Sequence, residues 1–420
     1  MQALARHLAR ATRTAAGYAV AATAAAAMLA LSASGAAADK KYGPGASDTE
    51  ILFGQTMPYS GPASAYGVIG KAQEAYFRML NEHGGVNGRK LRMLSYDDGY
   101  SPPKTVEQIR KLVEQDNVLF TFQTLGTPSN AAIQKYMNQK KVPQLFVSTG
   151  ASRFSEPKEF PWTMGFNPTY LTEGRIYGRY IRAHKPDGKI AILYQNDDFG
   201  REVITGLRQG LGAGADKMII AEVSYEVTDP TVDSQMVRLK NSGADVFVNL
   251  TTPKFAAQAI RKAAELQWKP MHLLTVNSVS ITQVLKPAGV DNAKGILSIG
   301  YLKDWTDPAW KDDAGMKKWS AFMDKYMPGS DKDNAVYLYA YTAAQLLEQV
   351  LKAAGDDLTR ENIMKQAASM KDVTLDLFLP GMSVNTSPTD YLVVEQMRMA
   401  RFDGERWVPF GELIDASDSH

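Results

Sequence analysis

Short apolar runs alternate with helix-like patterns along most of the chain from Ile51 onward. In the helix-like patterns the apolar residues recur about every three or four positions, and glycine or proline stands at many boundaries. Alternation of this kind is typical of βαβ units, in which parallel strands are connected by helices. The first series of predicted strands comprises residues 51–57, 91–96, 118–122 and 144–147.

A pause in the alternation divides the chain into two series. Residues 160–168 contain two prolines and a glycine, a composition that favours an irregular crossing between two lobes. The alternation of strands and helices then starts again. The predicted strands comprise residues 190–194, 218–223, 246–249 and 272–275, and the predicted helices lie near residues 169–184, 200–211, 232–242 and 254–266.

The last part of the chain is predicted to return to the first lobe and to end in a hairpin. We expect residues 296–301 to form a strand of the first lobe, and helices to follow near residues 308–326, 334–354 and 360–370. Asp403-Gly404 separates two apolar stretches, residues 391–402 and 406–410. This dipeptide favours the tight turn of a β-hairpin.

These patterns together predict an α/β fold with two doubly wound, Rossmann-like lobes joined by a hinge. A chain of this length also exceeds what one hydrophobic core usually serves. We expect the N-terminal lobe to comprise residues 48–167 and 296–388, and the C-terminal lobe residues 168–295 and 389–420. A ligand cleft is expected between the lobes, as in a clamshell.

The N-terminal segment predicts export from the cytoplasm. Arg6, Arg10 and Arg13 precede an apolar run over residues 15–31, and Ala36-Ala37-Ala38 forms a signal-peptidase pattern. We therefore expect residues 1–38 to be a cleaved signal peptide and the mature protein to work in the periplasm. The alternative is an uncleaved membrane anchor, which is less favoured because the run is mostly alanine.

Composition narrows the possible functions. Removal of residues 1–38 takes away three of the 47 basic residues and none of the 45 acidic ones, so the mature chain is nearly neutral. A neutral chain gives no electrostatic reason to expect a nucleic acid as a partner. The chain has no cysteine, which excludes a thiolate nucleophile and a zinc–thiolate site.

The motifs that could carry catalysis or bind a cofactor or metal are weak. The histidines have no metal-ligand spacing, and Ser60 lacks the glycine two positions before it that a nucleophile elbow requires. The glycines of residues 210–214 follow a predicted helix, whereas a dinucleotide loop follows a strand. The acidic pairs at residues 97–98 and 197–198 are explained by turn hydrogen bonds. We therefore expect no catalytic residue, no metal and no cofactor.

Polar loops at the carboxyl ends of the predicted strands are the better candidates for a site, because doubly wound sheets bind ligands there. The loop at Thr127 leads into a helix N-terminus, whose free N–H groups suit a carboxylate or another small anion, although ordinary capping explains the hydroxyl equally well. The candidate loops comprise residues 60–67, 123–129, 148–151, 196–200, 251–254 and 277–278.

In these loops and beyond, the chain resembles the leucine/isoleucine/valine-binding protein family, the type I solute-binding receptors of ABC importers. The resemblance extends over nearly the whole mature chain and includes the order of its motifs. The matching segments are Ser60-Gly61-Pro62 with Ala65-Tyr66-Gly67, then residues 81–89, Tyr96-Asp97-Asp98, residues 194–200 and Gly243-Ala244-Asp245. A cysteine pair found in some relatives is replaced by Tyr100 and Gly126.

The resemblance implies a set of ligand-binding positions. The carboxylate-binding groups fall on Thr127, on Ser148 and on the backbone N–H of Gly150, while Tyr66 and Phe199 shape the pocket for the ligand's side chain. The second lobe contributes Thr252 and Asn277.

At Asn277 amino-acid binders carry an acid that pairs with the ligand ammonium, so we expect a carboxylate or amide with an apolar or aromatic body instead of a free α-amino acid. If the alignment at Asn277 is off by a residue, Asp197 or Asp198 serves the ammonium.

The function implied by the resemblance is that of a periplasmic receptor that captures a small organic solute by hinge closure. An inner-membrane ABC permease is the expected partner, and the receptor is expected to be a monomer. Two alternatives stay open: a sensor subunit that signals to a membrane receptor, and an exported α/β hydrolase. The hydrolase is disfavoured because the chain lacks a nucleophile elbow and metal motifs.

Overall fold

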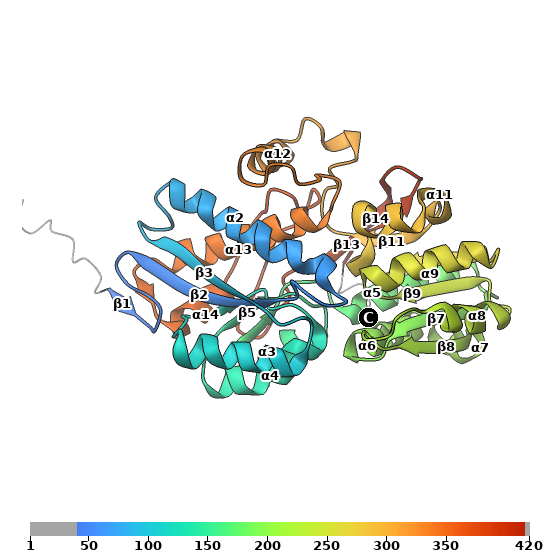
Figure 1. Cartoon of the computed structure of the whole chain (residues 1–420), viewed down its shortest axis with the longest axis horizontal. Helices are drawn as coiled ribbons and strands as arrows, with labels where there is room; N and C mark the ends of the chain where they lie inside the picture. Colours follow the sequence, from blue (N-terminus) through green and yellow to red (C-terminus); the bar gives the residue numbers. More distant parts are fainter. Residues whose placement is uncertain (1–39, 416–420) are drawn as a thin grey trace, which may run out of the picture. The chain divides into compact units, whose positions relative to one another are not determined.

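The computed structural model describes residues 40–415, and the elements from β2 (Glu50–Met57) onward belong to one compact unit that begins at Tyr42. The expected signal peptide, residues 1–38, lies outside the described residues. Two β-sheets organise the unit, and most helices pack against one or the other (Figure 1). A two-residue strand, β1 (Lys41–Tyr42), precedes them.

The first sheet has five parallel strands in the order β3-β2-β4-β5-β6. Its strands are β2 (Glu50–Met57), β3 (Lys90–Asp97), β4 (Thr121–Phe122), β5 (Gln144–Val147) and β6 (Thr163–Gly165). Its connecting helices are α2 (Val68–Glu82), α3 (Pro102–Arg110) and α4 (Thr127–Gln139). The four predicted strands are present, with β4 shorter than expected. The fifth, β6, lies within residues 160–168, where only a crossing was expected.

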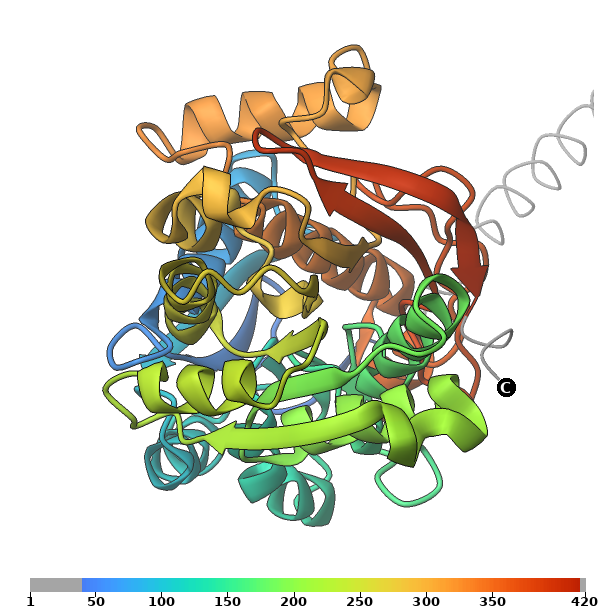
Figure 2. The ribbon, with the colours of Figure 1, turned by 90° about the vertical axis from the view of Figure 1, so that its right-hand side faces the viewer.

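The second sheet has seven strands in the order β14-β13-β11-β10-β9-β7-β8. Figure 2 shows it from its outer side, with the β13–β14 hairpin in red at one edge. The strands are β7 (Ile190–Gln195), β8 (Ile219–Tyr225), β9 (Val246–Leu250), β10 (Met271–Leu274), β11 (Leu297–Gly300), β13 (Gln396–Phe402) and β14 (Trp407–Asp415). The helices of this lobe are α5 (Tyr170–His184), α6 (Asp198–Leu211), α7 (Ala215–Met218), α8 (Asp233–Asn241), α9 (Pro253–Glu265), α10 (Lys286–Ala288) and α11 (Val290–Ala293).

The place where the chain returns to the first lobe differs from the prediction. Strand β11 pairs in parallel with β10 and antiparallel with β13, so the expectation that residues 296–301 belong to the first lobe is wrong. The hairpin needs a neighbouring strand to join the sheet, and β11 provides it. The return comes after β11, with α12 (Ala314–Tyr326), α13 (Val336–Ala354), β12 (Asp357–Leu358) and α14 (Arg360–Ala367).

The returning helices are fastened to the first lobe by buried contacts. Helix α13 packs on α2, where the Tyr76 hydroxyl donates to Glu348 at 2.5 Å. The Tyr76 ring also meets the edge of the Tyr341 ring, with centroids 5.0 Å apart. The first lobe is therefore assembled from two segments that are far apart in the sequence.

The glycines of helix α6 serve helix packing. A methyl group at Gly206 would lie 2.1 Å from the carbonyl oxygen of Leu171 in α5, and one at Gly210 would lie 2.3 Å from that of Arg175. Glycine is needed because the two backbones touch, as small residues permit. This close packing gives part of the glycine-rich stretch a structural role without a nucleotide.

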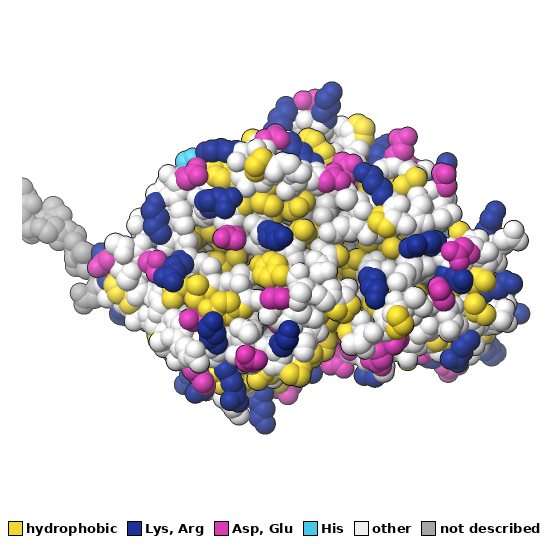
Figure 3. Space-filling model, in the orientation of Figure 1, with side chains coloured by type: hydrophobic (Ala, Val, Ile, Leu, Met, Phe, Trp, Pro, Cys, Tyr) yellow, Lys and Arg dark blue, Asp and Glu magenta, His cyan; other side chains and the backbone are white. Residues whose placement is uncertain are grey.

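The expected hairpin turn at Asp403-Gly404 is confirmed. The Asp403 carboxylate accepts the N–H groups of Glu405 and Arg406, and Gly404 has a φ of +112°. Between residues 40 and 415 no helix is long and apolar enough to cross a bilayer. On the face drawn in Figure 3, basic and acidic side chains of the described residues are intermixed.

Candidate functional site

A cavity of about 190 Å³ lies between the two lobes. Three of the predicted site residues line it from the first lobe, namely Tyr66, Thr127 and Ser148. Three more line it from the second lobe: Phe199, Thr252 and Asn277. The loops that carry them follow the carboxyl ends of parallel strands, which explains why residues so distant in sequence meet there.

Gly150 is the predicted site residue that the structure places outside the cavity lining. Its carbonyl oxygen accepts the N–H of Tyr170 at 2.8 Å, and a methyl group at this position would lie 2.4 Å from the carbonyl oxygen of Pro168. The backbone of Gly150 is packed against the start of α5, and Tyr170 lines the cavity in its place.

The N-terminus of helix α4 faces the cavity through Gly126 and Thr127. Thr127 was expected to be the N-cap, but the N-cap is Gly126, whose φ of +102° favours glycine. The Thr127 hydroxyl makes no capping bond and is instead 2.7 Å from the hydroxyl of Thr149. The Tyr100 ring lies against Gly126, because a methyl group added at Gly126 would be 2.6 Å from a carbon of that ring. Tyr100 and Gly126, which stand where some relatives have a cysteine pair, are therefore in contact.

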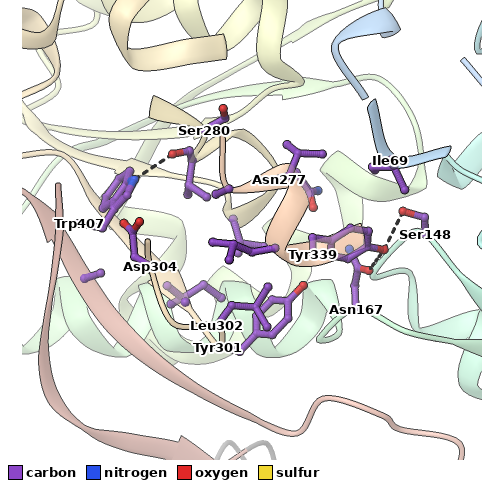
Figure 4. Close-up of a pocket in the computed structure, with 18 of the residues that line it drawn as sticks. Ile69, Ser148, Asn167, Asn277, Ser280, Tyr301, Leu302, Asp304, Tyr339 and Trp407 are labelled. Carbon is purple, nitrogen blue, oxygen red and sulfur yellow. Dashed lines mark hydrogen bonds between the residues drawn. The ribbon is translucent and has the colours of Figure 1, made fainter. Parts of the chain in front are cut away.

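Ser148 belongs to a short chain of hydrogen bonds that the sequence did not reveal. Its hydroxyl is 2.8 Å from the hydroxyl of Tyr339, which donates to the side-chain oxygen of Asn167 at 2.8 Å (Figure 4). Tyr339 comes from α13, the helix that returns to the first lobe. Burial raises the pKa of Tyr339, so its hydroxyl keeps its proton and can donate.

Asn277 is held by two tyrosines. The Tyr66 hydroxyl donates to the Asn277 backbone carbonyl at 3.1 Å, and the Asn277 side-chain N–H donates to the Tyr170 hydroxyl at 3.1 Å. Burial raises the pKa of Tyr170 to about 12 and that of Tyr66 well above its ordinary value. Both hydroxyls are therefore neutral at physiological pH, and the Tyr66 bond connects the first lobe to the second.

Other hydrogen bonds also cross from lobe to lobe. The Gln283 side chain donates to the Ala65 carbonyl at 2.8 Å, and the Ser152 N–H donates to the Glu202 carboxylate at 2.9 Å. Burial raises the pKa of Glu202 to about 7, while the Ser152 bond opposes that rise. Direct contacts therefore join the two lobes around the cavity.

Phe199 and Thr252 form the second lobe's wall of the cavity. The Phe199 ring packs on Tyr170 with centroids 4.7 Å apart. The Tyr225 hydroxyl lies 3.2 Å from the Thr252 hydroxyl and accepts the Thr252 N–H at 3.0 Å. Both predicted residues are almost fully buried.

The carboxylates near the cavity do not replace the acid missing at Asn277. Asp197 caps α6 by accepting the Gly200 N–H, and Asp198 pairs with Arg153. Neither residue lines the cavity, so the structure does not support the alternative in which one of them binds the ammonium group of the ligand. Glu173 accepts the Val276 N–H at 2.9 Å from behind the cavity wall, and burial raises its pKa to about 7. Among the described residues that line the cavity, the acids are Asp304 and Asp307.

Asp304 lies at the other end of the cavity, a place that the sequence did not indicate, and its backbone carbonyl accepts the N–H of Asp307 at 3.1 Å. Figure 4 places Asp304 beside Trp407, opposite Ser148 and Asn167. Asp307 is paired with Arg406, whereas the Asp304 carboxylate accepts the Thr306 N–H at 3.0 Å. In the part of the chain that the structure describes, no cluster of His, Asp and Glu could hold a metal ion.

Two open-sheet lobes with a cavity between them, which apolar side chains line together with a few polar groups, define a bilobed ligand-binding protein. A family model described as periplasmic binding protein matches residues 50–406, and the chain belongs to this family. The resemblance stated from the motifs is thereby confirmed.

Among its relatives, "Leu/Ile/Val-binding protein homolog 1" of Brucella abortus is 25% identical over 342 residues, which cover 79% of this chain and 87% of the relative. "Amino acid binding protein" of Pseudomonas aeruginosa is 21% identical, covering 73% of this chain and 79% of that protein.

Solved structures confirm the two-lobed fold. A branched-chain amino acid ABC transporter protein from Thermus thermophilus with bound valine has a TM-score of 0.79 at 17% identity, covering 89% of this chain and 98% of that one. A solute-binding protein from Rhodopseudomonas palustris in complex with 3,4-dihydroxy benzoic acid has a TM-score of 0.73 at 17% identity, covering 87% and 98%.

Proposed function

We propose that this protein is the solute-binding subunit of an ABC importer and captures a small carboxylate or amide with an apolar or aromatic body. The observation that carries the proposal is the cavity itself, which both lobes line and which contains hydroxyls, a helix N-terminus and aromatic rings. The family membership supports the transport role. Its relatives are solute-binding proteins, and we infer binding without catalysis for this chain as well.

The carboxylate of the solute is proposed to bind at the N-terminus of α4, near Thr127 and Ser148. The first N–H groups of a helix have no partner within the helix, and the helix dipole favours a negative charge there. Hydroxyl groups of Thr127 and Ser148 line the same part of the cavity. Together these groups offer hydrogen-bond donors to an anion without a compensating cation.

An α-amino acid is disfavoured because its ammonium group would lack a carboxylate partner. Asn277 offers an amide, and the lining acids Asp304 and Asp307 lie at the other end of the cavity. A buried ammonium without a charged partner costs on the order of a few kcal/mol. The 3,4-dihydroxy benzoic acid bound by the Rhodopseudomonas protein is a carboxylate of the proposed kind, whereas the valine of the Thermus protein is not.

Capture is proposed to occur by closure of the two lobes around the solute. A ligand stabilises the closed form only to the extent that it binds that form more tightly than the open one. A solute in contact with Thr127 and Ser148 on one side and with Phe199 and Thr252 on the other meets this condition. The cross-lobe bonds from Tyr66 and Gln283 assist closure.

The proposal also covers the cellular location of the protein, its transport partner and the residues that make up each lobe. We place the protein in the periplasm, exported by the signal peptide of residues 1–38, as a monomer that delivers its solute to an inner-membrane permease. The lobes are proposed to comprise residues 48–167 with the returning segment after β11, and residues 168–300 with the hairpin.

A thermal-shift screen of residues 39–420 tests the proposal against aliphatic amino acids, aromatic and aliphatic carboxylates, and amides. A ligand at about a hundred times its dissociation constant adds about 2.7 kcal/mol of stability, a shift of several degrees. We expect carboxylates or amides to raise the midpoint. Thr127→Ala should weaken their binding by about 1–3 kcal/mol without unfolding the protein. Stabilisation by leucine and valine alone would refute the proposed solute class.

A further inference from the structure

The cavity continues well past the residues that the family resemblance assigns to the solute. Figure 4 shows Ser148, Asn167 and Tyr339 at one end, Tyr301 and Leu302 in the middle, and Asp304 with Trp407 at the other end. We call the part around Asp304 and Trp407 the far chamber. A ligand of the size of a single amino acid bound at Thr127 would leave this chamber unused.

The middle of the cavity, where Figure 4 shows Leu302 and the ring of Tyr301, is largely apolar. The cavity lining also includes the apolar side chains of Ile299, Val336 and Leu379, which offer no hydrogen bond to a solute. An apolar passage of this kind favours methylene groups or a ring, because burying apolar surface is favourable by about 25 cal/mol per Å². The middle of the cavity therefore suits the unbranched body of a longer molecule.

The far chamber ends in a carboxylate beside aromatic rings. Burial raises the pKa of Asp304, and the N–H groups of Thr306 and Trp407 oppose the rise. The other charged groups around the chamber have partners: Lys303 pairs with Asp313, Asp307 pairs with Arg406, and the Arg398 side chain donates to the Gly411 carbonyl at 2.7 Å. Among the described residues, no ion pair with Asp304 is found at 4 Å or less.

The Trp407 side chain fixes the wall of the chamber next to Asp304. Its indole N–H donates to the Val279 carbonyl at 2.8 Å, and its ring packs on Phe402 with centroids 5.6 Å apart. A carboxylate next to an aromatic wall is a setting in which an ammonium group gains both a charge-assisted hydrogen bond and attraction to a ring face.

We propose that the site takes an elongated solute, with a carboxylate at the Thr127 end, an apolar chain through the middle, and a hydrogen-bond donor, best an ammonium group, at Asp304. The inference rests on the proposed function and names the substrate class of the same cavity.

Gly300 provides a way to obstruct the passage. It lines the cavity between Ile299 and Tyr301, and a methyl group added there would meet no atom within 4 Å. Gly300→Leu should therefore enter the open space without displacing the backbone. Gly214→Val is the matched control, because Gly214 lies outside the lining and its nearest neighbour is the Met218 sulfur at 3.6 Å.

The experiment is isothermal titration of residues 39–420 with butanoate, octanoate and the ω-amino derivative of octanoate. Octanoate should bind about two hundredfold more tightly than butanoate, since it has four more methylenes and each buried methylene adds about 0.8 kcal/mol. The ω-amino derivative should bind more tightly than octanoate, and Asp304→Asn should abolish that advantage. Gly300→Leu should abolish the advantage of octanoate over butanoate, while Gly214→Val should preserve it.

The outcomes separate this inference from the proposed function. If carboxylates bind but octanoate has no advantage over butanoate, or keeps its advantage in Gly300→Leu, the elongated solute is refuted and the proposed function stands. If the ω-amino group gives no advantage, or gives the same one in Asp304→Asn, the role of Asp304 is refuted. If none of the three compounds binds while leucine or valine stabilises the protein in the thermal-shift screen, both the proposed solute class and the elongated solute are wrong.

Discussion

The hydrogen bond from Tyr66 to Asn277 should act as a latch of the closed form. The bond joins the first lobe to the second at 3.1 Å, so it exists only when the lobes are closed. In an open form both groups would be hydrated, and the loss of the hydroxyl would have little effect there. Tyr66→Phe should therefore shift the balance toward the open form without destabilising either lobe.

The size of the effect follows from the net value of one neutral hydrogen bond, about 0.5–1.5 kcal/mol. A loss of about 1 kcal/mol weakens the affinity for a ligand of the closed form about fivefold. The control is Tyr59→Phe, which removes a tyrosine hydroxyl that lies 2.6 Å from the Ser95 hydroxyl within the first lobe. The control should lower the free energy of unfolding while leaving the affinity unchanged.

Isothermal titration with the tightest-binding carboxylate of the screen measures the affinities, and urea unfolding measures the stabilities. Small-angle scattering adds the radius of gyration of the ligand-free protein, which should be larger for Tyr66→Phe than for the control. Equal affinities of Tyr66→Phe and the unaltered protein would refute the latch, as would an equal loss in both variants.

Three further predictions concern stability and specificity. Burial of Glu173 raises its pKa to about 7, above the unfolded value of 4.5, so stability is greatest below about pH 4.5 and is lost as the pH rises through 7. In urea, Glu173→Gln should match the unaltered protein near pH 4.5 and exceed it by roughly 2–3 kcal/mol near pH 8; a pH-independent difference would contradict this. Gly206→Ala places a methyl group 2.1 Å from the Leu171 carbonyl and should cost about 1–3 kcal/mol of unfolding free energy by thermal denaturation, whereas an unchanged midpoint would disprove the contact. Asn277→Asp places a carboxylate where the resemblance expects the ligand ammonium to bind, and should increase the affinity for leucine measured by titration. An unchanged affinity would show that residue 277 does not contact the ammonium group.

Much of the fold could be predicted because its strands have strong local signals. The apolar runs at residues 190–194 and 246–249 lie between clear turns and became β7 and β9 within a residue of their expected bounds. The loops that follow parallel strands meet at one edge of each sheet, so most of the predicted lining residues could be named as well. The helix boundary at Thr127 was off by one residue, since glycine at 126 adopts a positive φ and becomes the cap.

The parts that escaped prediction depend on contacts between distant segments. A short apolar run such as β11 suits either sheet, and its place is set by the β13–β14 hairpin about a hundred residues later in the chain, which pairs along its edge. Tyr339 lies in a continuous helical pattern, which does not indicate which residue faces a cavity 191 residues away at Ser148. The far chamber likewise draws on segments that meet only after the lobes assemble.

The most direct test compares leucine with isocaproate, the same molecule without its amino group, by isothermal titration against residues 39–420. The pair isolates the ammonium group, which the near end of the cavity leaves without a carboxylate partner. We predict measurable binding of isocaproate and an affinity for leucine weaker by at least about tenfold. Tighter binding of leucine than of isocaproate would contradict the proposed solute class. It would also show that another group in the cavity binds the ammonium group of leucine.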